Sequence, residues 1–399
     1  MIGCATFCTK AAMSRLGRFC ILGLGISLAA CASPTQTPHS PLYVATFATD
    51  PPTEILVAQQ GKTWVIRNGE ERVTLIPRTA NSFEVPVFQG SWVGEWEGGV
   101  WTGVWTDSLR PNNYHIPLEI HPLATQSTST PREVETTLWD TSEGLLVLKS
   151  RGDSVWATIT TPVGDYRFLS GTLSHNKLIF SNFDGSHLFR FEATLRGDSL
   201  VDGSFLSGTH YRTSFEGVKN PSRKVSWHSA TQQPVSQELR IQGVLPTGEV
   251  DVWTLERLRS EGKTGLVLDI MGTWCPNCMD ETRLLQSLVS QEPNVQFLSL
   301  AFERHTDSLA LRRIESFQHH MGLSWPILLG GRANKGEAAA ALSFLDTLYS
   351  FPTTVFWPLE GQPVIHKGFN GPATGEGYEV EVSFFQSQLA RLNGRLENH

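Results

Sequence analysis

Hydrophobic and polar residues alternate in short runs from residue 42 to residue 217, and Gly, Asn and Asp separate the runs. A period of two is typical of antiparallel strands with one buried face, and this stretch has almost no helical period. The pattern predicts an antiparallel β domain over 42–217, for which a sandwich and a barrel both remain open. Within it, later strands are expected at 155–159, 166–169, 177–180 and 188–191.

Four tryptophans are expected to meet on one hairpin of this domain. Trp92 and Trp96 share one face of a strand, Trp101 and Trp105 share one face of the next, and residues 97–99 form the turn. The cluster is either a stacking platform for a sugar or a partner, or a core packed by large aromatic rings. Because such rings contribute most to a small β core, the second interpretation is favoured.

From residue 236 to residue 396 the pattern changes to continuous apolar runs that alternate with amphipathic segments. Such runs are typical of strands buried on both faces, and strands that alternate with helices predict an α/β sheet covered by helices on both sides. The expected strands are 266–271 and 295–301. One helix is expected to open in the second half of the segment 274–278, and others are expected at 307–321, 334–348 and 377–395. Residues 218–235 lose the strand alternation and are expected to be the linker.

Two cysteines stand between the first of these strands and its helix, in Trp274-Cys275-Pro276-Asn277-Cys278. The helix N-terminus stabilises an anion, which lowers the pKa of Cys275 and favours its nucleophilic thiolate. Cys278 lies further into the helix, where it can attack the resulting mixed disulfide and release the substrate. Asp269, an acid inside the apolar strand, is expected to accept the proton of Cys278.

Residues 272–278 together with Glu281 resemble the TlpA/ResA branch of the thioredoxin superfamily, and the resemblance covers roughly residues 236–396. It implies an extracytoplasmic thiol-disulfide oxidoreductase with an α/β thioredoxin-like fold. The chain is thus expected to be multidomain, with an N-terminal all-β domain before the thioredoxin-like domain. The Pro-Asn dipeptide between the cysteines and the long N-terminal half depart from the branch and leave the redox potential and partner open.

The same resemblance identifies Pro352, in the segment 350–354, as the cis-proline that faces the dithiol in this superfamily. Its geometry leaves the backbone of Phe351 free to pair with an extended substrate peptide. Trp274, Pro276, Phe351 and Thr353 are therefore expected to form the substrate groove, and Pro352 joins the catalytic set.

The N-terminus resembles a bacterial lipoprotein signal. Arg15 and Arg18 precede an apolar run over residues 19–30, which ends in Leu28-Ala29-Ala30-Cys31. An ordinary signal peptide and a membrane span are the alternatives, but the run is too short for the roughly 30 Å core of a bilayer. We expect a signal peptide over 1–30, lipidation of Cys31 and a tether over 31–41. The protein is then expected to be anchored in the cell envelope and to face the periplasm, with the outer membrane favoured over the inner membrane.

Removal of the signal peptide would change both the number of free thiols and the net charge of the protein. Of the six cysteines, Cys4, Cys8 and Cys20 leave with the signal and Cys31 is lipidated, so Cys275 and Cys278 alone remain as thiols. A structural zinc site needs about four ligands, so neither a metal nor another cofactor is expected. The formal charge of −7 becomes −10 when the three cations of residues 1–30 are removed, which makes nucleic acid an improbable partner.

Two further polar pairs admit both a functional and a structural interpretation. Asp184 and His187 lie in an expected turn, where a hydrogen-bonded cap is commoner than a metal site or a base. Glu303 and Arg304 follow a strand at the edge where α/β sheets place their sites, and a surface ion pair is the favoured interpretation.

The leading hypothesis is a lipid-anchored protein-disulfide reductase that acts on cysteine-containing periplasmic or surface proteins and is recharged by a membrane electron carrier of the DsbD type. The alternatives are a glycan- or protein-binding surface lipoprotein with a vestigial thioredoxin-like half and, ranked lower, a peroxidase of the peroxiredoxin class. The peroxidase needs a Pro-x-x-x-Thr/Ser-x-x-Cys arrangement, and Thr273 has the wrong offset from Cys275 for it.

Overall fold

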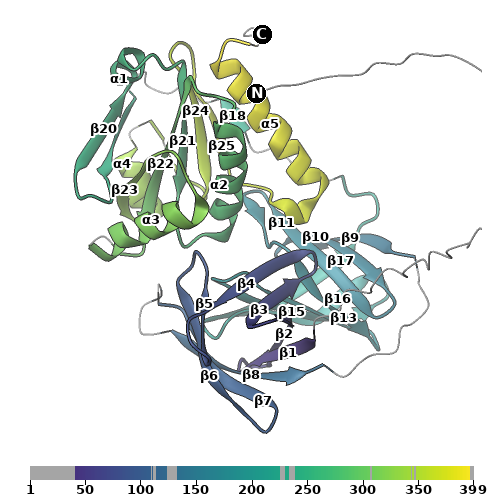
Figure 1. Cartoon of the computed structure of the whole chain (residues 1–399). Helices are drawn as coiled ribbons and strands as arrows, with labels where there is room; N and C mark the ends of the chain where they lie inside the picture. Colours follow the sequence, from purple (N-terminus) through teal and green to yellow (C-terminus); the bar gives the residue numbers. More distant parts are fainter. Residues whose placement is uncertain are drawn as a thin grey trace, which may run out of the picture. The chain divides into compact units, whose positions relative to one another are not determined.

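The computed structural model describes residues 41–108, 110, 114–123, 133–224, 230–232, 239–305, 308–342, 344–345 and 347–395 (Figure 1). They belong to one of two units into which the chain divides, the one that runs from Ser40 to His399. The expected signal peptide and Cys31 lie outside the described residues, as do most of the tether and part of the linker. None of the helices in the described ranges is long and apolar enough to cross a membrane.

The first part of the β-rich half is a closed antiparallel barrel in which each strand pairs with the next and the last pairs with the first. One of the two architectures left open by the sequence, the barrel, is therefore present. Its strands are β1 (Leu42–Phe47), β2 (Thr53–Gln60), β3 (Thr63–Asn68), β4 (Glu71–Pro77), β5 (Ser82–Val85), β6 (Gly90–Glu97), β7 (Val100–Thr106) and β8 (His115–Pro122).

The tryptophan hairpin is mainly a packing element of this barrel. In the register of β6 and β7, Trp92 lies opposite Trp105 and Trp96 opposite Trp101. Trp92, Trp101 and Trp105 are buried, whereas Trp96 is 43% exposed and stacks on Trp64 at a ring distance of 6.0 Å. The core interpretation is thus confirmed for three of the four rings.

The second part is a nine-stranded antiparallel sheet in the order β10-β9-β17-β16-β15-β14-β13-β11-β12, and a further pairing joins β10 to β11. It forms its own core of apolar side chains, among them Phe180, Phe191 and Phe215. Its strands are β9 (Glu135–Thr141), β10 (Gly144–Arg151), β11 (Ser154–Thr161), β12 (Gly164–Asp165), β13 (Leu169–Ser174), β14 (Lys177–Phe183), β15 (Leu188–Arg196), β16 (Ser199–Ser207) and β17 (Tyr211–Lys219).

The strand expected at 166–169 is wrong. Arg167 has a φ of 60°, in the left-handed region that ends an extended strand, so the chain turns between β12 and β13. This turn carries the side chains that reach the candidate active site.

The third part is a mixed eight-stranded sheet in the order β18-β25-β24-β21-β22-β23-β19-β20. The strands are β18 (Ala230–Gln232), β19 (Arg240–Val244), β20 (Val250–Thr254), β21 (Gly265–Met271), β22 (Val295–Glu303), β23 (Ile327–Arg332), β24 (Thr353–Pro358) and β25 (Val364–Lys367). The helices are α1 (Leu255–Ser260), α2 (Pro276–Val289), α3 (Ser308–Met321), α4 (Lys335–Ala341), the short 3-10 helix η1 (Pro372–Thr374) and α5 (Glu376–Leu392). The helix expected at 334–348 is therefore shorter than its apolar pattern indicated.

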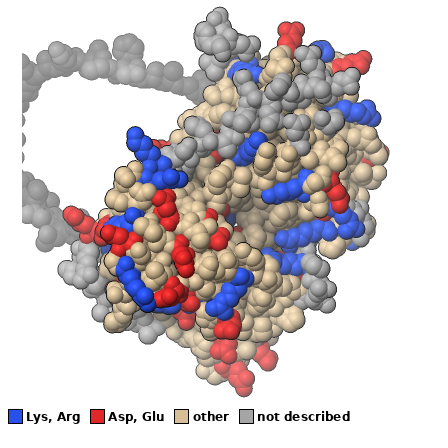
Figure 2. All heavy atoms as spheres, turned by 180° about the vertical axis from the view of Figure 1, so that it is seen from behind, with Lys and Arg blue, Asp and Glu red and all other residues tan. Residues whose placement is uncertain are grey.

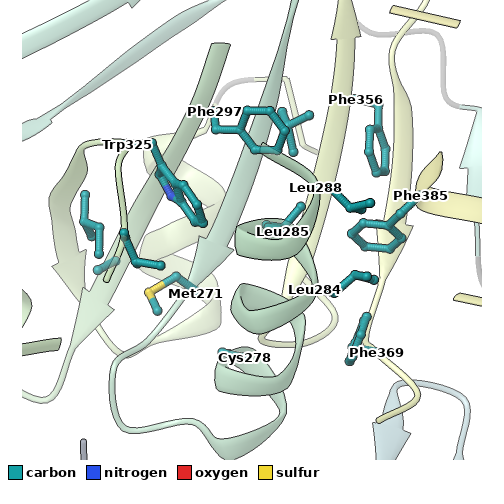
Figure 3. Packing of buried hydrophobic residues seen from close by; sticks show 14 of the residues in the cluster. Met271, Cys278, Leu284, Leu285, Leu288, Phe297, Trp325, Phe356, Phe369 and Phe385 are labelled. Carbon is teal, nitrogen blue, oxygen red and sulfur yellow. The ribbon is translucent and has the colours of Figure 1, made fainter. Parts of the chain in front are cut away.

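Alternate residues of the central strand β21 face two different cores. Val267 and Met271 pack in the cluster that contains residues of α2, α3 and α5, whereas Leu268 packs with residues of α1 and α4. Figure 3 shows the first cluster, with the leucines of α2 beside Phe385 of α5 and with Cys278 in the first turn of α2. The all-apolar run of β21 thus results from burial on both faces.

Charged side chains do not dominate the face of the molecule seen in Figure 2. On the face shown in Figure 2, acidic and basic side chains are interspersed among wide areas of uncharged residues.

Candidate active site

The two cysteines stand at the N-terminus of α2 and are joined by a disulfide. Cys275 is the N-cap, Pro276 occupies the first helical position, and the Cys278 backbone N–H donates to the Cys275 sulfur at 3.2 Å. Cys275 is 6% exposed and Cys278 is 0% exposed. The geometry favours a negative charge on Cys275 because an orphan N–H and the helix dipole both point at its sulfur.

The loop before the dithiol is held by the strand β22. Glu303 is buried and accepts two hydrogen bonds from Thr273, one from the backbone N–H at 2.8 Å and one from the hydroxyl at 2.9 Å. Burial raises the pKa of Glu303, and the Thr273 bonds oppose the rise. The predicted surface ion pair of Glu303 with Arg304 is therefore wrong. Arg304 instead lies over the ring of Trp274, 5.0 Å from its centroid.

Asp269 lies on β21 and is buried. One carboxylate oxygen accepts a 2.9 Å hydrogen bond from the Ser299 hydroxyl, and the other has no hydrogen-bond partner within the described part of the chain. Burial raises the pKa of Asp269 to about 7, and the Ser299 bond opposes the rise. A carboxyl group with this pKa can take up and release a proton near neutral pH.

A second buried acid, Glu281, accompanies Asp269. It accepts a hydrogen bond from the hydroxyl of Thr354, and Thr354 is the cross-strand partner of Asp269. Burial, and next the charge of Asp269, raise the pKa of Glu281 well above its ordinary value. In the sequence, Glu281 stands out only as part of the family motif. Its position three residues after Cys278, on the same helix face, was the signal that could have placed it in the site.

The segment around Pro352 lies beside the dithiol. The Phe351–Pro352 peptide bond is cis, as the resemblance implied, and the Phe351 carbonyl oxygen lies 3.6 Å from the Cys275 sulfur. The ring of Phe351 meets that of Trp274 edge to face at 5.8 Å. Thr353, expected in the substrate groove, is buried, and its hydroxyl donates to the Ser350 carbonyl oxygen at 2.9 Å.

Arg167, from the turn after β12, binds the first turn of α2, a contact that was not predicted from the sequence. Its guanidinium donates to the Pro276 carbonyl oxygen at 2.9 Å and pairs with the carboxylates of Asp280 and Glu71. Burial alone lowers the pKa of this guanidinium, but the two carboxylates outweigh it and raise the pKa. Arg167 thereby connects the barrel, the nine-stranded sheet and the dithiol helix.

The other residue between the cysteines is held from the same turn. The Asn277 side-chain amide donates to the Asp165 carbonyl oxygen at 3.0 Å, and the Asp165 carboxylate accepts from the Gly371 N–H at 2.8 Å. Burial raises the pKa of Asp165 to about 6. Gly164 allows this close approach, because a Cβ there would meet the Asn277 amide nitrogen at 2.6 Å.

A cleft of about 420 Å³ opens over the dithiol. Cys275 lies in its wall, together with three of the four expected groove residues, Trp274, Pro276 and Phe351. The opposite wall comes from the nine-stranded sheet and consists of Thr161, Val163, Gly164, Asp165, Tyr166, Arg167, Asp184, His187 and Phe189.

Asp184 and His187 form the expected hydrogen-bonded cap. The Asp184 carboxylate accepts from the N–H groups of Ser186 at 2.8 Å and His187 at 2.7 Å, and its other oxygen lies 3.1 Å from His187 Nδ1. Across the described residues, no group of three or more His, Cys, Asp or Glu side chains is placed to hold a metal ion.

No family model matches this sequence, and no curated protein matches it. Solved thioredoxin-fold structures are similar to part of the chain. A secreted disulfide oxidoreductase of Mycobacterium tuberculosis, homologous to Escherichia coli DsbE, is 17% identical, with 38% of this chain and 95% of that one covered at a TM-score of 0.27. A thiol:disulfide interchange protein of Chlorobium tepidum TLS is 16% identical (38% and 99% covered, TM-score 0.26). One from Bacteroides sp. is 15% identical (39% and 91%, TM-score 0.27). At these values the similarity assigns no function.

Proposed function

We propose that the chain is a thiol-disulfide oxidoreductase that reduces disulfides of protein substrates through Cys275 and Cys278. One observation carries the proposal. The disulfide-bonded pair occupies a helix N-terminus with one sulfur in the wall of a cleft and the other fully buried. Such an arrangement separates an attacking thiol from a resolving thiol.

In the reduced protein, the Cys275 thiolate attacks one sulfur of the substrate disulfide. A mixed disulfide forms, and the other substrate sulfur leaves as a thiolate. Cys278 then gives its proton to the Asp269 carboxylate and attacks the Cys275 sulfur, which forms the Cys275–Cys278 disulfide and frees the second substrate sulfur. The two electrons of the dithiol reduce the substrate, and protonation of the two released thiolates completes the exchange.

The roles of the surrounding residues follow from their positions. Asp269, whose pKa burial raises to about 7, accepts the Cys278 proton, and its charge in turn raises the pKa of the second buried acid, Glu281. The carbonyl of Phe351, before Pro352 and next to the Cys275 sulfur, is available to an extended substrate backbone.

We further propose that Cys31 is lipidated and that the protein faces the periplasm, where a membrane electron carrier of the DsbD type restores the dithiol. The lipobox at 28–31 supports this proposal. A Cys31→Ser precursor should stay uncleaved and lack acyl chains. A variant that still carries acyl chains and partitions wholly into detergent contradicts lipidation at Cys31.

Reduction of insulin and of glutathione disulfide by the full-length, pre-reduced protein tests the catalytic proposal. We expect wild type to reduce both, Cys275→Ser to be inactive, and Cys278→Ser to stop at a mixed disulfide. Wild-type protein that reduces neither substrate contradicts the proposal and favours a binding lipoprotein with a vestigial redox half.

A further inference from the structure

The wall of the dithiol cleft that comes from the nine-stranded sheet is bound to the very residues that separate the two cysteines. The Pro276 carbonyl accepts from Arg167, and the Asn277 amide donates to the backbone of Asp165. A third contact joins the Ser186 hydroxyl to the Trp274 carbonyl oxygen at 3.2 Å. The sheet is therefore hydrogen-bonded to three residues around Cys275, namely Trp274, Pro276 and Asn277.

This wall packs closely on the residues around the dithiol, at two glycines. A Cβ at Gly164 would meet Asn277, and a Cβ at Gly368 would meet the backbone of Val163 at 2.3 Å. Both glycines have positive φ values, 140° and 74°, so a side chain there is disfavoured by conformation as well as by space. The turn 161–167 thus packs directly on Asn277 and Gly368.

The charged residues of this wall are not the groups that a substrate meets. Asp165, Arg167 and Asp184 are each buried, and each is engaged in hydrogen bonds or ion pairs. The partly exposed positions are mainly apolar or aromatic. Across the cleft from Trp274 and Phe351 they are Val163, which is 37% exposed, Tyr166, His187 and Phe189.

The size of the cleft limits what can reach Cys275. Its 420 Å³ falls within the range of about 300–1,000 Å³ in which proteins hold small ligands. A stable interface between folded proteins buries about 800 Å² on each partner, so a broad folded surface needs contacts outside the cleft. A narrow chain segment fits inside the cleft.

We infer that the turn 161–167 and residues 187–189 are the second, specificity-determining wall of the substrate site. The wall selects a single extended cysteine-bearing segment with an apolar or aromatic residue beside the cysteine. This inference rests on the proposed function. The N-terminal half of the chain then serves as part of the reductase, and the substrate class is the unfolded or loop segment of a cysteine-containing protein.

The first test compares three disulfide-linked peptides that differ only in the residue beside the cysteine, which is Phe, Glu or Lys. The full-length, reduced wild-type protein should prefer the Phe peptide over the Glu peptide in kcat/KM by about tenfold, the scale of one apolar contact in a pocket. Val163→Glu should remove that preference and favour the Lys peptide. Val218→Glu, at a 57% exposed position of β17, is the matched control and should keep the wild-type order.

A second measurement does not depend on how Val163→Glu folds. The Cys278→Ala protein is trapped as a mixed disulfide with a peptide that carries a benzophenone beside its cysteine, and photocrosslinks are mapped. We expect crosslinks to residues 161–167 or 187–189. Crosslinks confined to 274–277 and 351 overturn the inference.

The outcomes separate the two levels of the proposal. If the protein exchanges disulfides with glutathione disulfide but has the same kcat/KM for the three peptides, only the specificity-determining role of the second wall is contradicted. A protein that exchanges with none of these reagents contradicts the proposed function and the inference together.

Discussion

The guanidinium of Arg167 donates a 2.9 Å hydrogen bond to the carbonyl oxygen of Pro276, the residue that follows Cys275. The same side chain pairs with the buried carboxylate of Asp280 and with the partly buried carboxylate of Glu71. One cation therefore fixes the dithiol turn against both the barrel and the nine-stranded sheet. Arg167 precedes Pro276 by 109 residues in the sequence.

Arg167→Met should destabilise the protein strongly, because it leaves the buried Asp280 with only the more exposed Arg283 and leaves the partly buried Glu71 without its cation. We expect the free energy of unfolding to fall by about 3–5 kcal/mol, the usual loss when one partner of a buried ion pair is removed. Urea denaturation followed by tryptophan fluorescence measures the change. Arg196→Met, which breaks the exposed pair with Asp202, is the matched control and should leave the midpoint almost unchanged. Equal effects of the two variants on the free energy of unfolding contradict this stabilising role of Arg167.

The strand β21, the helix α2 and the dithiol between them were predictable from the sequence, because each depends on local periodicity and on residues close in the chain. Asp269 was also predictable, because an unpaired acid buried in an apolar strand is energetically costly and therefore indicates a function. Arg167 was not. Its neighbours alternate like a strand, and neither its left-handed backbone nor partners as distant as Pro276 leave a local signal.

The fold shows the same division. Alternation predicted strands over 42–217, but periodicity does not say which strands pair, so the barrel of β1 to β8 and the separate nine-stranded sheet emerged only from the structure. The proposed domain boundaries and the roles of the site residues stay predictions.

Cys275 should be the thiol that reacts first. Its sulfur receives the Cys278 N–H at the start of α2, so its pKa should fall below the free-cysteine value of about 8.5. In the reduced protein, iodoacetamide at mildly acidic pH should label Cys275 before Cys278, as read by peptide mass mapping. Cys278→Ala should accumulate a mixed disulfide through Cys275. Preferential labelling of Cys278 reverses the assigned roles.

Asp269→Asn should slow the second chemical step and leave the first unchanged, because the amide cannot accept the Cys278 proton. Stopped-flow mixing of the reduced protein with a disulfide peptide resolves formation and decay of the mixed disulfide. Asp198→Asn, at an exposed turn, is the matched control. Loss in both phases, or in neither, removes Asp269 from the proton transfer.

The same substitution should change how stability depends on pH. The folded-state pKa of Asp269 is raised to about 7 by burial, above its unfolded value, so the folded state binds the proton more tightly. Its contribution is fully present below about pH 4 and is lost as the pH rises through about 7, with a slope of up to about 1.4 kcal/mol per pH unit. Asp269→Asn should remove this loss, so the variant gains stability relative to wild type between about pH 4 and pH 7. A difference that is constant with pH contradicts the raised pKa.

The reduction potential should be that of a reductant. Strong oxidants of the DsbA kind owe their potential to an extremely stabilised thiolate, and they typically place a histidine between their cysteines. Here Pro276 and Asn277 occupy those positions, and the cation that binds the Pro276 carbonyl, Arg167, is matched by the carboxylates of Glu71 and Asp280. No net positive charge from this group is therefore left to stabilise the Cys275 thiolate further. We expect a potential nearer to thioredoxin's roughly −270 mV than to DsbA's roughly −120 mV, a difference worth about 7 kcal/mol at about 1.4 kcal/mol per 30 mV.

Equilibration of the purified protein with a series of glutathione redox buffers, followed by quantification of the Cys275–Cys278 disulfide, measures this potential. Arg167→Met, where it folds, should shift the value only slightly, because the substitution removes a neutralised cation. If the dithiol titrates at the DsbA end and is fully oxidised in living cells, the protein donates disulfides. The same cleft and the same two cysteines then run the exchange in the opposite direction, since thiol-disulfide exchange is reversible and the potential alone decides its course.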